Sequence, residues 1–272
     1  MRYSPKLPER NDNVSHTSPV REFFLILLGL LGVAALVFWV LGLLIDVLVD
    51  RISPETEAKI SRAVAIKWAE EKPYSLEKQT RVQKLADEMA TCAALPYEAS
   101  VSLADAPQAN ALALPGGQIV VFSGLIDKLQ SENGLAFVLA HEFSHLKNRD
   151  HLRGMGRSLV LVTASVVLTG SHSGLTQLFI PLNQFGMARH SQAREMQADQ
   201  TALQIMHCFY GHVGGAGEFF EAMQKDERVD DAGFSHYFAS HPALRERIAA
   251  LQQAIRTHGY REGSVRPLSW AE

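Results

Sequence analysis

The chain has 272 residues, of which 47% are hydrophobic and 20% are charged, and its formal net charge is −3. This length and apolar content support one sizeable core with an appendage, so we expect a single main domain. A chain so close to neutral, with no basic stripe, gives no reason to expect a nucleic-acid partner.

The N-terminal part of the chain changes abruptly from polar to apolar. Residues 1–22 contain three prolines and show no hydrophobic period, which predicts a disordered tail. Residues 23–45 contain no charged residue, and a helix of this length can cross a hydrocarbon core about 30 Å thick. The run exceeds the roughly 7–15 apolar residues of a cleavable signal peptide, and no small-residue cleavage site follows it. We therefore predict a retained transmembrane helix that anchors the chain in a lipid membrane, with a buried core helix as the alternative.

Basic residues flank this span on both sides. Those that precede it are Arg2, Lys6, Arg10 and Arg21, and those that follow it are Arg51, Lys59 and Arg62. Four against three favours a cytoplasmic N-terminus by the positive-inside rule. The sequence thus predicts a single-pass inner or plasma membrane protein. The residues that follow the span would lie outside the cytoplasm.

The next segments are predicted to be packing elements. The sequence Ser53-Pro54-Glu55 has the order of a helix start, and a second helix is expected from about Ser75. Residues 97–103 alternate between apolar and polar, as a half-buried strand requires. Residues 111–114 and 118–122 flank Pro115-Gly116-Gly117, which predicts two strands joined by a tight turn.

The motif His141-Glu142-Phe143-Ser144-His145 lies inside an apolar run and carries the main chemical signal. On a helix, residues i and i+4 lie one above the other, so His141 and His145 point at a common spot where a zinc ion fits. Glu142 lies on an adjacent part of the same face, where a carboxylate can take a proton from water. This spacing is typical of a hydrolase, although a plain polar helix face is the alternative until a third ligand is found.

A second pair of residues at helical spacing supplies that ligand. Glu195 and Asp199 are also four residues apart, so a second helix would offer one carboxylate to the metal and another to orient a ligand histidine. Catalytic zinc takes three protein ligands and keeps one open position. We therefore predict one zinc ion held by His141, His145 and Glu195.

Together these motifs resemble family M48 of the zinc metallopeptidases, in the gluzincin group. Three further segments are similar to its motifs: the Asn-Ala-x-Ala-x-Pro-Gly-Gly stretch at 110–117, the block at 191–199, and Ser240-His241-Pro242 running on to Arg247-Ile248. The resemblance covers about residues 55–255. One departure is Gln192, where the family usually has arginine.

The resemblance implies a mainly helical α+β fold, with a small β-sheet beside the active-site helix, over residues 53–258. Residues 259–272 would be a C-terminal tail. By the same resemblance, His241 stabilises the developing oxyanion or gates the open zinc position. Residues Ile119, Val120 and Val121 would form an edge strand that hydrogen-bonds an extended polypeptide substrate, with a purely structural hairpin as the alternative.

Two features stay open at this level. The apolar segment 158–182 cannot cross the membrane if zinc is bound, since a crossing would separate His145 from Glu195; it is either a core hairpin or a segment that dips into the membrane surface. Cys92 and Cys208 are the two cysteines of the chain, and they form either a disulfide or two separate thiols. His207 and His212 are expected to serve packing rather than metal binding.

These patterns favour a membrane-anchored zinc endopeptidase that takes part in protein quality control. By resemblance, its substrates would be misfolded or misassembled membrane or envelope proteins. The alternatives are a membrane-tethered, zinc-containing chaperone-like or binding module, and a hydrolase of non-peptide substrates. Glu142 argues against the module, because a purely structural metal site has no use for a base.

Overall fold

A computed structural model of the chain describes residues 18–65, 75–169, 191–227, 241 and 244–268. The chain divides into two compact units, Met1–Leu44 and Ile45–Glu272.

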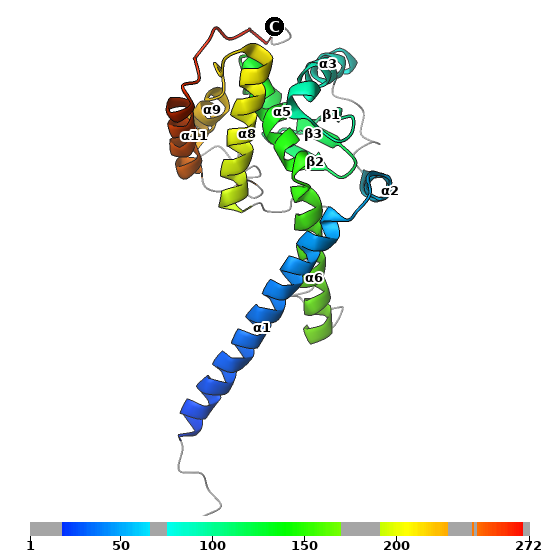
Figure 1. Ribbon diagram of the computed structural model, residues 1–272, viewed down its shortest axis with the longest axis vertical. Helices are drawn as coiled ribbons and strands as arrows, with labels where there is room; N and C mark the ends of the chain where they lie inside the picture. Colours follow the sequence, from blue (N-terminus) through cyan, green and yellow to red (C-terminus); the bar gives the residue numbers. More distant parts are fainter. Residues whose placement is uncertain (1–17, 66–74, 170–190, 228–240, 242–243, 269–272) are drawn as a thin grey trace, which may run out of the picture. The chain divides into compact units, whose positions relative to one another are not determined.

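The first unit consists mainly of helix α1, Pro19–Asp50, whose last residues belong to the second unit (Figure 1). Among the described residues, α1 is the helix long and apolar enough to cross a membrane. Its large apolar side chains are exposed, so the alternative of a buried core helix is wrong. Helix α1 starts at Pro19, so the prediction of a disordered tail to residue 22 is wrong for residues 19–22. Proline suits the first position of a helix because its φ is fixed near the helical value. Residues 1–17 lie outside the described part.

The second unit begins with the end of α1, at Ile45, rather than at Ser53. Arg149 donates from Nη1 to the carbonyl oxygens of Val49, at 2.9 Å, and of Ile52, at 2.7 Å. Val49 lies in the last turn of α1 and Ile52 just follows its end, so these bonds hold the C-terminal end of α1 in place. The second unit thus includes residues 45–52, which precede the predicted domain start at residue 53.

Helices α2, Pro54–Ala65, and α3, Leu76–Ala93, follow. Ser75 caps α3, since its side chain accepts a hydrogen bond from Lys78 N, and this confirms the predicted helix start. Val82, Leu85 and Met89 form the buried stripe of α3 that the helical spacing indicates.

Three short strands form one sheet: β1, Ser100–Ala104, β2, Ala111–Leu114, and β3, Gln118–Phe122. The strand order is β1-β3-β2, with β1 parallel and β2 antiparallel to β3. The prediction that Ile119, Val120 and Val121 form an edge strand is therefore wrong. They lie in the central strand, because the hairpin places β2 on one side of β3 while β1 pairs with the other side. The free edges of the described sheet belong to β1 and β2.

The remaining helices are α4, Ser123–Ile126; α5, Glu132–Lys147; α6, Asp150–Thr169; α8, Gln192–Tyr210; α9, Glu218–Glu227; and α11, Leu244–His258. Helix α5 is buried on nearly all sides, with α8 packed along it and α3 and β2 also in contact (Figure 1). Its apolar run, including Leu135, Phe137 and Phe143, forms the centre of the core. The mainly helical α+β fold with a small sheet beside α5 is thus confirmed.

Helix α6 covers the first half of the apolar segment 158–182. Leu159 is 59% exposed and Leu161 is 39% exposed, so the core hairpin is wrong for this half of the segment. Residues 170–182 lie outside the described residues. Contact with a membrane surface stays a prediction.

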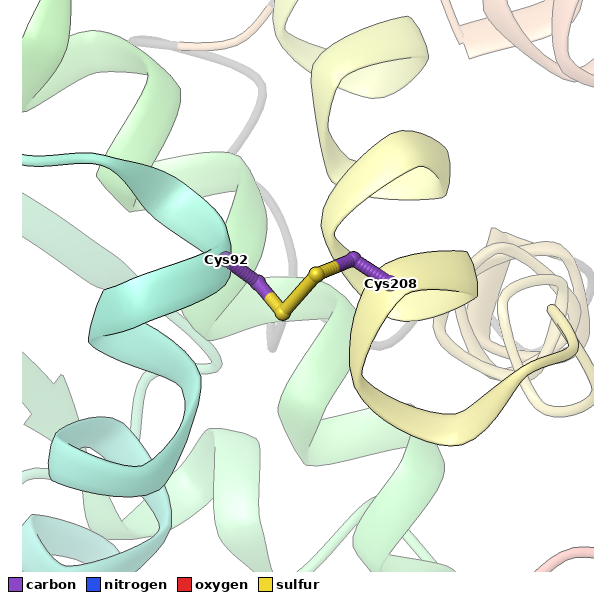
Figure 2. Close-up of a disulfide and its surroundings, with 2 residues drawn as sticks. All are labelled: Cys92 and Cys208. Carbon is purple, nitrogen blue, oxygen red and sulfur yellow. A yellow bond between two sulfur atoms is a disulfide. The ribbon is translucent and has the colours of Figure 1, made fainter.

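A disulfide joins Cys92 of α3 to Cys208 of α8, which resolves the alternative left open by the sequence (Figure 2). The bond spans 116 residues of chain and fixes the end of α8 against α3. Helix α8 is thereby held on both sides, by the disulfide and by its packing on α5.

The segment that follows α11 is not a free tail, in contrast to the prediction for residues 259–272. Glu132 N donates to Arg266 O at 2.8 Å, and Leu268 N donates to Gln130 O at 3.0 Å. Leu268 is also buried. These bonds use backbone groups at the start of α5 that its own helix leaves unpaired, so the described part of this segment belongs to the domain.

Candidate active site

Helix α5 brings the two motif histidines together. Ser131 caps its start by accepting a hydrogen bond from Gly134 N, and the helix runs unbroken to Lys147. The Nε2 atoms of His141 and His145 lie 3.1 Å apart, and both rings are buried. The predicted convergence of the two imidazoles is therefore observed.

Helix α8 adds the third predicted ligand from the opposite side. Ser191 caps α8, and Glu195 lies in its first turn. One carboxylate oxygen of Glu195 lies 3.5 Å from His141 Nε2, and the other lies 3.4 Å from His145 Nε2. The Glu195 side chain is fully buried.

These distances match a tetrahedral metal site. With zinc–nitrogen and zinc–oxygen bonds of about 2.0–2.1 Å, ligand atoms on a tetrahedron stand about 3.3 Å apart. The three separations measured here are 3.1, 3.4 and 3.5 Å. The buried donor set therefore fits a divalent cation that accepts nitrogen and oxygen ligands.

Carboxylates on the far side of each ring prepare the histidines for a metal. His141 Nδ1 lies 2.9 Å from Asp199, as predicted, and His145 Nδ1 lies 3.0 Å from Asp150. An ionised carboxylate only accepts hydrogen bonds, so each Nδ1 must carry the proton. The lone pair of each Nε2 is then free to bind the metal.

Arg247 holds both acidic residues of α8 in place. Its guanidinium donates to Asp199 at 2.7 and 2.8 Å, and Nη1 lies 2.8 Å from Glu195. The side chain is 1% exposed. Arg247 was expected only as part of a sequence motif, without a role, and the role of Asp150 was not predicted. The helical spacing of Glu195 and Asp199 carries no information about a guanidinium from α11.

The site is strongly polarised. Burial opposes ionisation of Asp199 and Glu195, but Arg247 beside the first and the three histidines around the second hold both carboxyl pKa values below the usual range. Burial likewise opposes protonation of His145, yet its bonds to Asp150 and Glu195 raise its pKa to about 10. A cation among these rings is thus electrostatically favoured, and a bound metal ion would supply that charge.

His241 completes the cluster. Its Nδ1 lies 3.0 Å from both carboxylate oxygens of Glu195, and its Nε2 lies 3.9 Å from Glu142 Oε1. Ligand atoms of His141, His145, Glu195 and His241 all lie within 4.8 Å of one another. The structure therefore places His241 where a fourth ligand would stand.

Glu142 lies beside the cluster without joining the ligand set. The residue is 1% exposed, and within the described part of the chain its Oε1 atom has no hydrogen-bond partner. A buried carboxylate oxygen without a partner is costly, so it calls for a bound water molecule or substrate group. This geometry suits a proton acceptor.

Other residues named by the sequence lie elsewhere. The His207 ring packs on Tyr260, with centroids 5.0 Å apart, and His212 Nδ1 accepts from Gly214 N. Gln192 is exposed at the start of α8. In this chain Arg194 supplies a positive charge near Asp150, at 3.3 Å.

Comparisons with known proteins agree with this geometry. The family model described as Peptidase family M48 matches residues 76–255. The chain is 32% identical over 154 residues to the mitochondrial metalloendopeptidase OMA1 of Schizosaccharomyces pombe, covering 54% of this chain and 44% of that protein. It is 30% identical over 163 residues to the beta-barrel assembly-enhancing protease of Escherichia coli, covering 52% and 31%.

A further relative is the OMA1 metalloendopeptidase of Saccharomyces cerevisiae, which is 30% identical over 147 residues, covering 51% of this chain and 41% of that protein. The chain thus spans less than half the length of these curated relatives. The matched family segment nevertheless contains every residue of the cluster, from His141 to Arg247. The chain therefore belongs to peptidase family M48.

Proposed function

We propose that the protein is a zinc-dependent endopeptidase. The observation that carries the proposal is the buried convergence of His141, His145 and Glu195, with the unpaired carboxylate oxygen of Glu142 beside them. When bound there, a zinc ion acts as a Lewis acid that polarises the peptide carbonyl group and makes water more acidic. Nitrogen and oxygen ligands in a compact tetrahedral set favour zinc over calcium or magnesium.

The protein's own residues move the proton. Glu142 accepts a proton from the attacking water and then delivers it to the nitrogen of the departing amine. Asp150 and Asp199 keep the two ligand imidazoles in the required tautomer, and Arg247 holds Asp199 in position. Burial of all these groups excludes bulk water and strengthens each electrostatic contact.

We assign His241 a gating role in preference to oxyanion stabilisation. The Glu195 carboxylate only accepts hydrogen bonds, so Nδ1 of His241 donates and its Nε2 carries a lone pair. A ring with a free lone pair in this cluster suits a fourth ligand that must leave before substrate enters. An oxyanion would instead require a donor at Nε2.

The substrate is proposed to be an extended polypeptide. Strand β2 packs against α5 and forms a free edge of the described sheet. Such an edge can hydrogen-bond a polypeptide backbone irrespective of its sequence. This role now falls to β2 and not to the central residues 119–121.

Membrane or envelope proteins in need of quality control are the proposed substrate class. The apolar helix α1 supports an anchored enzyme, and the relatives' names refer to mitochondrial metalloendopeptidases and to beta-barrel assembly. The Cys92–Cys208 disulfide supports a catalytic domain in an oxidising compartment outside the cytoplasm, since such bonds persist there. A topology reporter fused after Glu272 tests this placement, and a cytoplasmic signal would contradict it.

The experiment that tests the activity replaces Glu142 with glutamine. Glu142→Gln should keep the fold and the metal content while peptide cleavage falls by roughly 10²–10⁴-fold, because general-base catalysis is lost. Cleavage of unfolded casein and metal analysis are measured together. The control is Glu88→Gln. Glu88 is an exposed residue of α3 that pairs with Lys84, and this variant should cleave like the parent.

The outcome also decides between the enzyme and a chaperone-like module. Cleavage by Glu142→Gln at the parent's rate would rule out the proposed mechanism. Retained metal with no cleavage of any unfolded substrate by the parent would favour a membrane-tethered binding module.

A further inference from the structure

A polar cavity of about 470 Å³ lies within the second unit, apart from the metal ligands. Six charged residues line it, four of them basic: Lys147, Arg149, Arg153, Arg194, Asp50 and Asp150. The lining therefore carries two more positive than negative charges. The amide side chain of Gln197 contributes a further hydrogen-bond donor.

The basic groups differ in how far they are already engaged. Arg149 and Arg153 bind carbonyl and carboxylate oxygens at the end of α1. Arg194 forms longer ion pairs, at 3.3 Å to Asp150 and at 3.8 Å to Asp46. Lys147 is exposed and makes one bond of 3.3 Å, to Ala93 O. Arg194 and Lys147 thus have donors to offer to an anion.

One lining residue of the cavity lies close in the chain to the end of the predicted membrane span. Asp50 lines it and lies in α1 five residues beyond Ile45, the last residue of the apolar span. At 1.5 Å per helical residue this separation is about 7.5 Å. The polar headgroup layer on each side of the hydrocarbon core is about 5–7 Å thick. Asp50 therefore follows the apolar span by roughly the thickness of one headgroup layer.

Helix α6 gives a second, independent indication of lipid. Arg153 and Arg157 near its start bind Asp46, and Leu159 and Leu161 further along are exposed. Two basic residues one helical turn apart, followed by exposed leucines, are the order expected where a helix passes from headgroups toward acyl chains. A free phosphate ion has no apolar part that could contact these leucines.

We propose that this cavity binds the phosphate group of an anionic phospholipid. Lys147 from α5 and Arg194 from α8 contact the phosphate oxygens, and Gln197 adds a hydrogen bond. The proposal depends on membrane anchoring through α1 and is independent of whether the protein cleaves peptides.

The test uses the full chain in a non-ionic detergent. Thermal unfolding is followed during titration with dihexanoyl phosphatidylglycerol, with dihexanoyl phosphatidylcholine and with inorganic phosphate, because a ligand of the native state raises the melting temperature. The phosphatidylglycerol should bind saturably, and at least roughly ten-fold more tightly than either of the other two. Equal binding of phosphatidylcholine would overturn the site, and equal binding of inorganic phosphate would overturn its assignment to lipid.

Variants on two different helices locate the site. Lys147→Glu and Gln197→Glu each place a negative charge in the cavity and should weaken phosphatidylglycerol binding by at least roughly ten-fold. Lys84→Glu reverses an exposed charge on α3, outside the cavity, and should bind like the parent. If both cavity variants match Lys84→Glu, the proposal is wrong. Since Lys147 and Gln197 are exposed and lie on separate helices, either variant alone decides the question if the other fails to fold.

Discussion

The Nδ1 atom of His145 lies 3.0 Å from an oxygen of Asp150, across the junction between α5 and α6. Asp150→Asn should lower metal affinity by roughly 10–100-fold, because the ring loses the negative partner that fixes its tautomer and raises its basicity. Metal retention against a graded chelator measures the change. Asp87→Asn, on an exposed position of α3, is the matched control. Equal retention by both variants would show that Asp150 does not support the ligand.

Removing His241 tests the gate. His241→Ala should retain the metal, since three ligands remain, and should cleave unfolded casein at least as fast as the parent because the fourth position is open. The measurement is the initial rate at saturating substrate together with metal content. A loss of about 10²–10³-fold would instead return His241 to oxyanion stabilisation.

The boundary of the catalytic unit is tested by two truncations. A protein that starts at Ile45 keeps Asp46, Asp50 and the capped carbonyl groups, whereas one that starts at Ser53 leaves Arg149 and Arg153 without these partners. Unpaired, partly buried groups cost about 1–3 kcal/mol each, so the shorter protein should melt at least about 4 °C lower. Equal melting temperatures would contradict the assignment of residues 45–52 to this unit.

Glu57 leads to a prediction of how the stability of the fold depends on pH. Burial opposes its ionisation, but hydrogen bonds from His151 and Gly116 N and the charge of Arg149 bring its pKa below the ordinary 4.5. A lowered folded-state pKa stabilises the fold at pH above about 4.5, and this contribution is lost as pH falls below that value. Glu57→Gln should therefore be less stable at pH 7 and lose less stability on acidification.

Urea unfolding of both proteins at several pH values between 3 and 7 measures this difference. All other carboxylates are the same in both proteins, so their contribution to the pH dependence cancels. An unchanged pH dependence of stability in Glu57→Gln would show that Glu57 does not contribute to it. The control Glu88→Gln, at an exposed position, should resemble the parent at every pH.

Local signals predicted the helices of this protein well. Ser75 caps α3 where a helix start was predicted, through a hydrogen bond three residues on that depends only on neighbouring sequence. The separation of four residues between His141 and His145 is an equally local signal. The metal cluster could therefore be anticipated once Glu195 was recognised on a second helix.

Features that depend on tertiary pairing escaped prediction. The position of β3 in the sheet follows from the parallel pairing of β1, which no pattern within 118–122 reveals. Asp150 reaches His145 because Arg149 adopts a left-handed backbone conformation, φ 53°, which is uncommon for a residue other than glycine. The role of Arg247 depends in the same way on the packing of α11 against α8.

The segment after α11 has a consequence for biogenesis. Arg266 and Leu268 complete the backbone bonding at the start of the metal helix, and Ser131, which caps that helix, pairs with Pro267. A chain emerging from the ribosome, or through a translocation pore, cannot make these bonds until more than a hundred residues have followed His141 into solution. The start of α5, the helix that carries His141 and His145, is thus completed only after residues 266–268 have emerged.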